Sequence, residues 1–299
     1  MFFSGRPRFG ERVQQRMGII LLLAPALVVV LVLFVGGFGH GVAQSFGYLP
    51  FLEGSQVGVD AYADLWRDAE VRAGIGLTVR TALLATVLSF VLGVAGALLI
   101  RSSRRGRRLL SLIFQANLPV PHLVGALCML LLLSQTGAVS RLATASGLTD
   151  SAAGFPEVTG DGFGWSIVAA YVWKEAPFIG VVILAALSRG VADLEDVARS
   201  LGAGRWQRFR HVVLPVIAPG AAAASILVLA FTVGAYEVPY LLGRPFPAAL
   251  SVVALQRYRD IDLESRPLAM AITVLLFLTV TLLAVGYLAL ADRLRRISR

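Results

Sequence analysis

The stretch LAMAITVLLFLTVTLLAVGYLAL, residues 268–290, contains no charged side chain. The hydrocarbon layer of a bilayer is about 30 Å thick, and an apolar helix of roughly 20 residues crosses it. A helix also satisfies its own backbone hydrogen bonds in lipid. Because the stretch lacks the alternating pattern of a barrel strand, it predicts a membrane-spanning helix.

Five further apolar blocks of similar length precede this one. The predicted spans are residues 17–38, 79–100, 110–133, 165–187, 215–242 and 268–290. The composition agrees, since 57% of the 299 residues are hydrophobic and 15% are charged, with a mean hydropathy of +0.76. Soluble domains carry about 25% charged residues. We therefore expect an all-α polytopic membrane protein with about six transmembrane helices, forming one domain over residues 1–299.

The first block has a second interpretation as a cleaved signal peptide, because Gly41, Val42 and Ala43 resemble a cleavage site. However, its apolar stretch exceeds the roughly 7–15 residues usual for a signal peptide. We expect a retained helix.

The arginines are divided unevenly between alternate connections. The two ends of the chain and the second and fourth connections carry 18, whereas the other three connections carry eight. The positive-inside rule then predicts that both termini are cytoplasmic. A nucleic-acid partner is not expected despite the net charge of +9, because the basic residues are spread over several loops and not gathered on one face.

The fourth connection, RGVADLEDVARSLGAGRWQRFRHVVL at residues 189–214, predicts a cytoplasmic elbow of two short helices. Asp193 is predicted as the N-cap of the first helix, with Glu195 and Asp196 in its first turn. Gly202 provides the break expected at a helix end.

A second amphipathic segment follows Gly202. Its predicted apolar side carries Trp206, Phe209 and Val213, and its polar side carries Arg205, Gln207 and Arg208. Pro215 suits the opening turn of the next span. A loop folded in this way, over residues 190–214, indicates a docking surface.

The stretch LEDVARSLGAGRWQRFRHVVLP resembles the EAA loop of binding-protein-dependent ABC importer permeases. Asp196, Val197 and Ala198 take the places of the acidic-Ala-Ala triplet, and Gly202 takes the place of the glycine. Residues 214–215 match the Leu-Pro end. The chain departs from the pattern by Asp for the usual Glu and Val for the first Ala.

Three other stretches resemble the branch that serves polyamines, ferric iron and phosphonates. They are LPVPHLVGAL at 118–127, YVWKEAPF at 171–178 and FTVGAYEVPYLLGRPFP at 231–247. The resemblance covers most of the chain after Val59.

The resemblance implies a permease subunit of the type I fold, in a bacterial inner membrane, that forms half of a translocation pathway. The implied partners are cytoplasmic ABC ATPase subunits, a second permease that is identical or homologous, a periplasmic or lipid-anchored solute-binding protein, and the lipid bilayer. The elbow would be the coupling helix that seats in the ATPase. The implied coupling residues are Glu195, Asp196, Ala198, Gly202, Ala203, Arg205, Trp206, Arg208 and Phe209. Alternatively, the aromatic residues pack at the membrane interface, where Trp is common.

The sequence offers no catalytic constellation. Lys174 is the only lysine and follows Trp173, so the chain lacks the glycine–lysine pair of a phosphate-binding loop. The three histidines have no metal-ligand spacing with other residues. Cys128 is a single cysteine, expected to pack as a small apolar residue. We expect no enzyme activity, no metal and no cofactor in this chain, and an ATPase on a separate polypeptide.

Three ionisable residues are candidates for the translocation path, namely Lys174, Glu175 and Glu237. Charged groups at membrane depth are costly and suggest function. Lys174 and Glu175 either line the path or fix helix packing, while Glu237 either belongs to an outer gate or is solvated. His122 is expected to form a hydrogen bond at a kink. Residues 221–225, AAAAS, favour close helix packing in a dimer core or against a neighbouring span.

An ion-coupled secondary transporter, with these three residues as coupling groups, is the alternative function. Such folds often contain inverted repeats and broken helices, and the sequence shows no sign of them.

Overall fold

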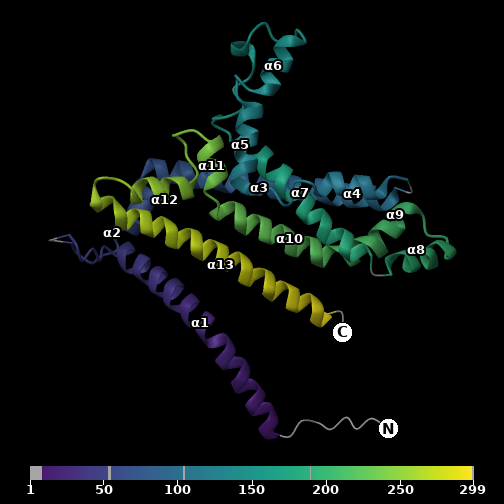
Figure 1. The fold of residues 1–299 in the computed structure, drawn as a ribbon, viewed down its shortest axis with the longest axis horizontal. Coiled ribbons are helices and arrows are strands. Elements are labelled where there is room, and N and C mark those ends of the chain that lie inside the picture. Colours follow the sequence, from purple (N-terminus) through teal and green to yellow (C-terminus); the bar gives the residue numbers. More distant parts are fainter. Residues whose placement is uncertain (1–8, 53–54, 104, 189, 298–299) are drawn as a thin grey trace.

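The computed structural model describes residues 9–52, 55–103, 105–188 and 190–297, and every regular element in these ranges is a helix (Figure 1). Six helical segments are long and apolar enough to cross a membrane. They are Ile20–Ser45, Ala69–Ser102, His122–Ala145, Trp165–Leu187, Arg205–Gly234 and Leu263–Ala289. The all-α fold with six candidate spans is confirmed. The two termini, which we expect in the cytoplasm, lie outside the described residues.

The centre of the fold is a bundle of three helices, α3 (Ala69–Ser102), α7 (Trp165–Leu187) and α10 (Leu214–Gly234). Small residues bring them together. A Cβ added to Gly93 of α3 would lie 2.8 Å from the carbonyl oxygen of Ala176. In α10, Ala221 and Ala224 are buried against Ile179 and other side chains of the same cluster. The alanine run therefore packs against neighbouring spans of its own chain.

The first and last spans are longer than predicted. They are α1 (Phe9–Ser45) and α13 (Arg266–Ile297). The ring centroids of Phe38 and Phe277 lie 4.2 Å apart where the two helices meet. From there α1 diverges from the rest of the molecule (Figure 1), and the most apolar window of its span buries no residue within the chain.

The span predicted for residues 110–133 is divided in the structure. The structure has α4 (Arg107–Gln115) and α5 (His122–Leu133), separated by a non-helical segment, and a further helix α6 (Ala138–Ala145). Proline explains the break, because Pro119 and Pro121 lack a donor and disfavour the helical conformation of the preceding residue. Cys128, expected to be packed, is exposed on α5.

The span predicted for residues 215–242 is also divided. Helix α10 ends at Gly234, and a short helix α11 (Glu237–Leu242) follows after an extended residue, Ala235. Pro215 does lie in the first turn of α10, as predicted.

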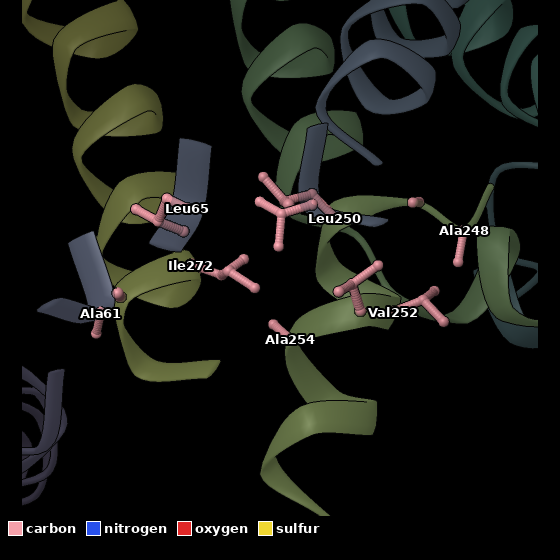
Figure 2. Packing of buried hydrophobic residues seen from close by; sticks show 11 residues of the cluster. Ala61, Leu65, Ala248, Leu250, Val252, Ala254 and Ile272 are labelled. Carbon is pink, nitrogen blue, oxygen red and sulfur yellow. The ribbon is translucent and has the colours of Figure 1, made fainter. Parts of the chain in front are cut away.

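A second apolar cluster joins three further helices. Ala61 and Leu65 of α2 (Asp60–Arg67) pack with Leu250 of α12 (Leu250–Tyr258) and Ile272 of α13 (Figure 2). Arg257 of α12 reinforces the contact with ion pairs to Asp68 and Glu70, at 2.9 and 2.7 Å. Two 3₁₀ turns, Ala152–Gly154 and Leu263–Ser265, lie in the connections.

The close contact at Gly93 generates a prediction. Gly93→Ala is expected to lower the free energy of unfolding by about 1–3 kcal/mol, because the backbone of α7 has no room to accommodate a methyl group. Gly76→Ala is the matched control on the same helix, where no described atom would lie within 4 Å of the added Cβ. It should be neutral or slightly stabilising. Unfolding in mixed micelles, followed by circular dichroism, measures both, and equal shifts would contradict the packing model.

Candidate coupling elbow and membrane-embedded polar cluster

The predicted elbow lies at one end of the molecule, beyond the ends of α7 and α10 and opposite α2 and α12 (Figure 1). It consists of α8 (Val191–Ser200), α9 (Arg205–Arg208) and one π-helical turn, η2 (Phe209–Val213), which runs directly into α10. The helix–Gly–helix layout predicted from the sequence is therefore present.

The start of α8 differs from the prediction. Gly190, with φ +70°, caps the helix, and Asp193 lies inside its first turn. Glycine adopts this left-handed conformation without a steric penalty, so the chain leaves α7 and begins α8 three residues earlier than the Asp193 cap would require. Glu195 and Asp196 consequently fall in the second turn, where the helix dipole favours them less.

The end of α8 is closed as expected at Gly202, whose φ is +85°. The Gly202 N–H donates to the Arg199 carbonyl and the Ala203 N–H to the Ala198 carbonyl, both at 3.0 Å. This pair of bonds is the Schellman arrangement. Ala198 and Ala203 thus contribute through their backbone.

The second segment does not have the apolar side predicted for it. Trp206 is 68% exposed, Phe209 is half-buried, and Val213 is buried in the cluster between α7 and α10. The π-helical turn changes the angular spacing of these positions, so Val213 is buried in the bundle while Trp206 stays exposed. The rings of Trp206 and Phe209 still stack, with centroids 5.6 Å apart.

An ion pair fixes the elbow to the bundle. Glu195 of α8 accepts a hydrogen bond from Arg101 at the end of α3, and Val191 at the start of α8 is fully buried in the core cluster. Asp196, in contrast, pairs with Arg199 one turn away, at 2.9 Å, and both side chains are well exposed. The elbow is therefore connected to three spans, by the chain to α7 and α10 and by the ion pair to α3.

The outer face of the elbow is apolar. Leu201 is 83% exposed, and Leu194 and Val197 are also exposed. Beside them is a groove of about 370 Å³ whose lining includes Ala198, Leu201, Ala203, Arg208 and His211. Large apolar side chains exposed together at the end of a protein indicate an interaction surface.

Lys174 lies in the middle of α7 and is buried. Its Nζ donates to the carbonyl oxygens of Asn117, Leu118 and Val120, at 2.7, 2.9 and 2.5 Å. Asn117 in turn donates through its side chain to the Trp173 carbonyl. These bonds supply a donor to carbonyls of the broken segment, and backbone groups at membrane depth need partners within the protein.

Glu175, the neighbour of Lys174, faces another direction. Its Oε1 lies 2.8 Å from Nε2 of His122, the first residue of α5, and the His122 ring centroid is 4.5 Å from that of Phe231. Glu237 is exposed at the start of α11. The three candidates for the path are therefore not gathered at one site. Lys174 and Glu175 contact the broken third span, whereas the Glu237 side chain is exposed.

Sequence reasoning missed Asn117 and Arg101. Asn117 offered a signal, since it is a polar residue beside two prolines in an apolar block. Arg101 offered none, because its pairing with Glu195 joins residues 94 positions apart. Among the described residues, no group of three or more His, Cys, Asp or Glu side chains is arranged to hold a metal ion.

Comparisons with known proteins agree on one family. A family model described as "Binding-protein-dependent transport system inner membrane component" matches residues 71–296. The trehalose/maltose transport system permease protein MalF of Thermococcus litoralis is 27% identical over 283 residues, covering 92% of this chain and 94% of that protein. The molybdenum transport system permease protein ModB of Mycobacterium tuberculosis is 28% identical over 70% of this chain and 76% of its own length.

Solved structures share the fold. A chain of a bacterial ABC transporter that imports the acidic polysaccharide alginate has a TM-score of 0.75 at 22% identity, covering 98% of this chain and all of that one. A second structure of an alginate transporter, in complex with a pentasaccharide-bound periplasmic protein, gives a TM-score of 0.78 at 19% identity. It covers 96% of this chain and 98% of that one.

The carbonyl contacts of Lys174 generate a prediction. Lys174→Met is expected to destabilise the protein by about 3 kcal/mol or more, because it leaves buried carbonyl groups without a donor. Glu175→Gln, which keeps a hydrogen-bonding group opposite His122, should cost less than about 1 kcal/mol. Thermal unfolding in detergent measures both. A stable Lys174→Met variant that has lost transport would contradict this role and favour one in the path.

Proposed function

Because this chain belongs to the family of binding-protein-dependent transport system inner membrane components and is the permease subunit of an ABC importer, we propose that residues 190–214 dock a separate ATPase subunit. The chain is a multi-pass inner-membrane protein and performs no catalysis itself. Because the chain belongs to this family, the alternative function as an ion-coupled secondary transporter is set aside.

The observation that supports the docking surface most strongly is the exposed apolar face of a well-fixed elbow. Leu201 and Trp206 are the most exposed large apolar side chains there, and the Schellman turn at Gly202 holds their two helices at a fixed angle. Aromatic anchors in desolvated pockets dominate most protein interfaces. Trp206 is the proposed anchor, with the groove beside Leu201 as the surface that receives a partner side chain.

The other predicted coupling residues divide into two groups in this proposal. Arg208 and Ala198 border the docking groove, and Ala203 and Gly202 form the turn. Glu195 acts indirectly, since its carboxylate is bound to Arg101. Asp196, Arg205 and Phe209 complete the set, with Phe209 stacked behind Trp206.

The coupling mechanism follows from the connections of the elbow. A displacement of Trp206 would be transmitted through α9 and η2 into α10, since these helices are continuous. A displacement of α8 would be transmitted to α7 along the chain and to α3 through Arg101. Closure of two ATPases would therefore tilt three packed spans together as a rigid body. Alternating access requires no chemistry in this chain.

Lys174 and Glu175 are proposed to fix the third span and not to line the path. Their partners, the carbonyls of residues 117–120 and His122, all belong to that broken span. Glu237 remains the proposed contact with solvent or solute, because it is exposed at the break between α10 and α11.

The remaining assignments are proposals on family grounds. They comprise a second permease, identical or homologous, a solute-binding protein outside, and cytoplasmic termini. The predicted polyamine, ferric iron and phosphonate branch stays a prediction, because the matched relatives are named for several solute classes, including sugars, molybdenum and sulfate. In this proposal, the external binding protein selects the solute.

Trp206→Ala is expected to reduce co-purification of the ATPase subunit by about tenfold or more, because it removes the proposed anchor. Trp165→Ala is the matched control, since Trp165 is 53% exposed at the opposite end of α7. Wild-type association of the Trp206→Ala variant would contradict the docking assignment.

Gly202→Pro should abolish transport-coupled ATP hydrolysis while leaving membrane insertion intact. Proline has a negative φ and no N–H, whereas this position has φ +85° and donates a hydrogen bond. Gly202→Asn is expected to retain most of the activity, because asparagine tolerates the left-handed conformation. ATPase assays on the reconstituted complex measure both, and equal loss in the two variants would contradict the role of the turn.

Labelling with an impermeant maleimide tests the orientation. In a Cys128→Ala background, Ser151→Cys in the connection before α7 should react in intact spheroplasts. Ser200→Cys at the end of α8 should react only after permeabilisation. Both positions are exposed, so reaction of Ser200→Cys from outside would overturn the topology.

A further inference from the structure

A second groove lies on the side of the elbow that faces α3, with a volume of about 600 Å³. Its apolar wall is formed by Leu98 and Leu99 of α3 together with Phe209 and Val213 of η2. The wall is open, since Leu99 is 61% exposed. The groove opens toward α3 and shares Arg208 with the groove beside Leu201.

The charged rim of this groove is basic. Arg101, Arg205 and Arg208 line it together with one acidic residue, Glu195. Arg101 already pairs with Glu195, which leaves the charges of Arg205 and Arg208 in excess. The Nε of Arg208 is buried and has no hydrogen-bond partner among the described residues. An anion with several acceptor oxygens would satisfy this donor.

The groove lies at the end of a candidate membrane span. Leu98 and Leu99 lie in the last turns of the candidate span Ala69–Ser102, and Val213 directly precedes Leu214, where α10 begins. The wall therefore lies at the end of this candidate span, where Leu99 is exposed beside the arginines. Acyl chains suit such a wall, and phosphate groups suit such a rim.

We propose that this groove binds an anionic phospholipid of the cytoplasmic leaflet. The phosphate lies between Arg205 and Arg208, and an acyl chain runs along Leu98 and Leu99. The inference rests on the cytoplasmic placement of the elbow in the proposed function. It assigns a lipid to the joint between α3 and the elbow, where the Arg101–Glu195 pair transmits movement. An acidic segment of the ATPase is the competing occupant, but it would not account for an apolar wall at the end of a candidate membrane span.

The test uses the full chain purified in detergent, with phosphatidylglycerol added as the probe and binding counted by native mass spectrometry. Arg205→Gln combined with Arg208→Gln is expected to weaken binding about thirty-fold, since each basic residue near a membrane contributes roughly fivefold. Arg107→Gln combined with Arg108→Gln is the matched control, because it removes the same charge from α4. The control should change binding less than threefold.

Several outcomes would overturn the proposal. Equal losses in the two double variants would mean a general basic surface, and equal binding of phosphatidylcholine would exclude headgroup recognition. Displacement by millimolar inorganic phosphate would indicate a free anion site, and displacement by the ATPase subunit would indicate a protein contact.

A third variant keeps the charges and places a larger side chain on the apolar wall. Leu99→Trp should also weaken phosphatidylglycerol binding by severalfold, and unchanged binding would exclude the acyl-chain position. Because lipid binding is measured without the ATPase, its loss can be distinguished from failure of the docking surface, which co-purification of the ATPase reports independently.

Discussion

Backbone hydrogen bonding in lipid is the constraint on which this structure depends. A helix satisfies its own carbonyl groups, but the break at Pro119 and Pro121 interrupts this pattern at membrane depth. Lys174 donates to three carbonyls of the broken segment, those of Asn117, Leu118 and Val120. The buried ammonium thereby makes a broken span tolerable, and the break allows α4 and α5 to take different directions from the bundle (Figure 1).

The same principle accounts for the partners of the two charges in α7. Lys174 and Glu175 are adjacent, yet one binds the break and the other binds His122 at the start of α5. Together they hold both ends of the non-helical segment against α7. Intramembrane charges suggest function by default, and here the function best supported by their partners is the placement of α5.

The elbow combines a rigid attachment with two different surfaces. Gly190 and Gly202 set the limits of α8 through their left-handed conformations, and the Arg101–Glu195 pair fixes it to α3. One side presents Leu201 and Trp206 for the proposed ATPase. The other presents arginines above an apolar wall for the proposed lipid. A joint with both contacts would connect nucleotide-driven movement to the boundary of the membrane.

The sequence alone determined the membrane class, six apolar spans, the family and the glycine at the end of α8, because each depends on composition or on residues close together in the chain. Only the tertiary structure decided the partners of Lys174, Glu175 and Glu195, since these contacts join residues more than 50 positions apart. It also decided where Trp206 and Val213 point. A helical sequence pattern assumes a constant number of residues per turn. The π-helical turn at η2 changes that number, and packing against α7 and α10 determines where the turn occurs.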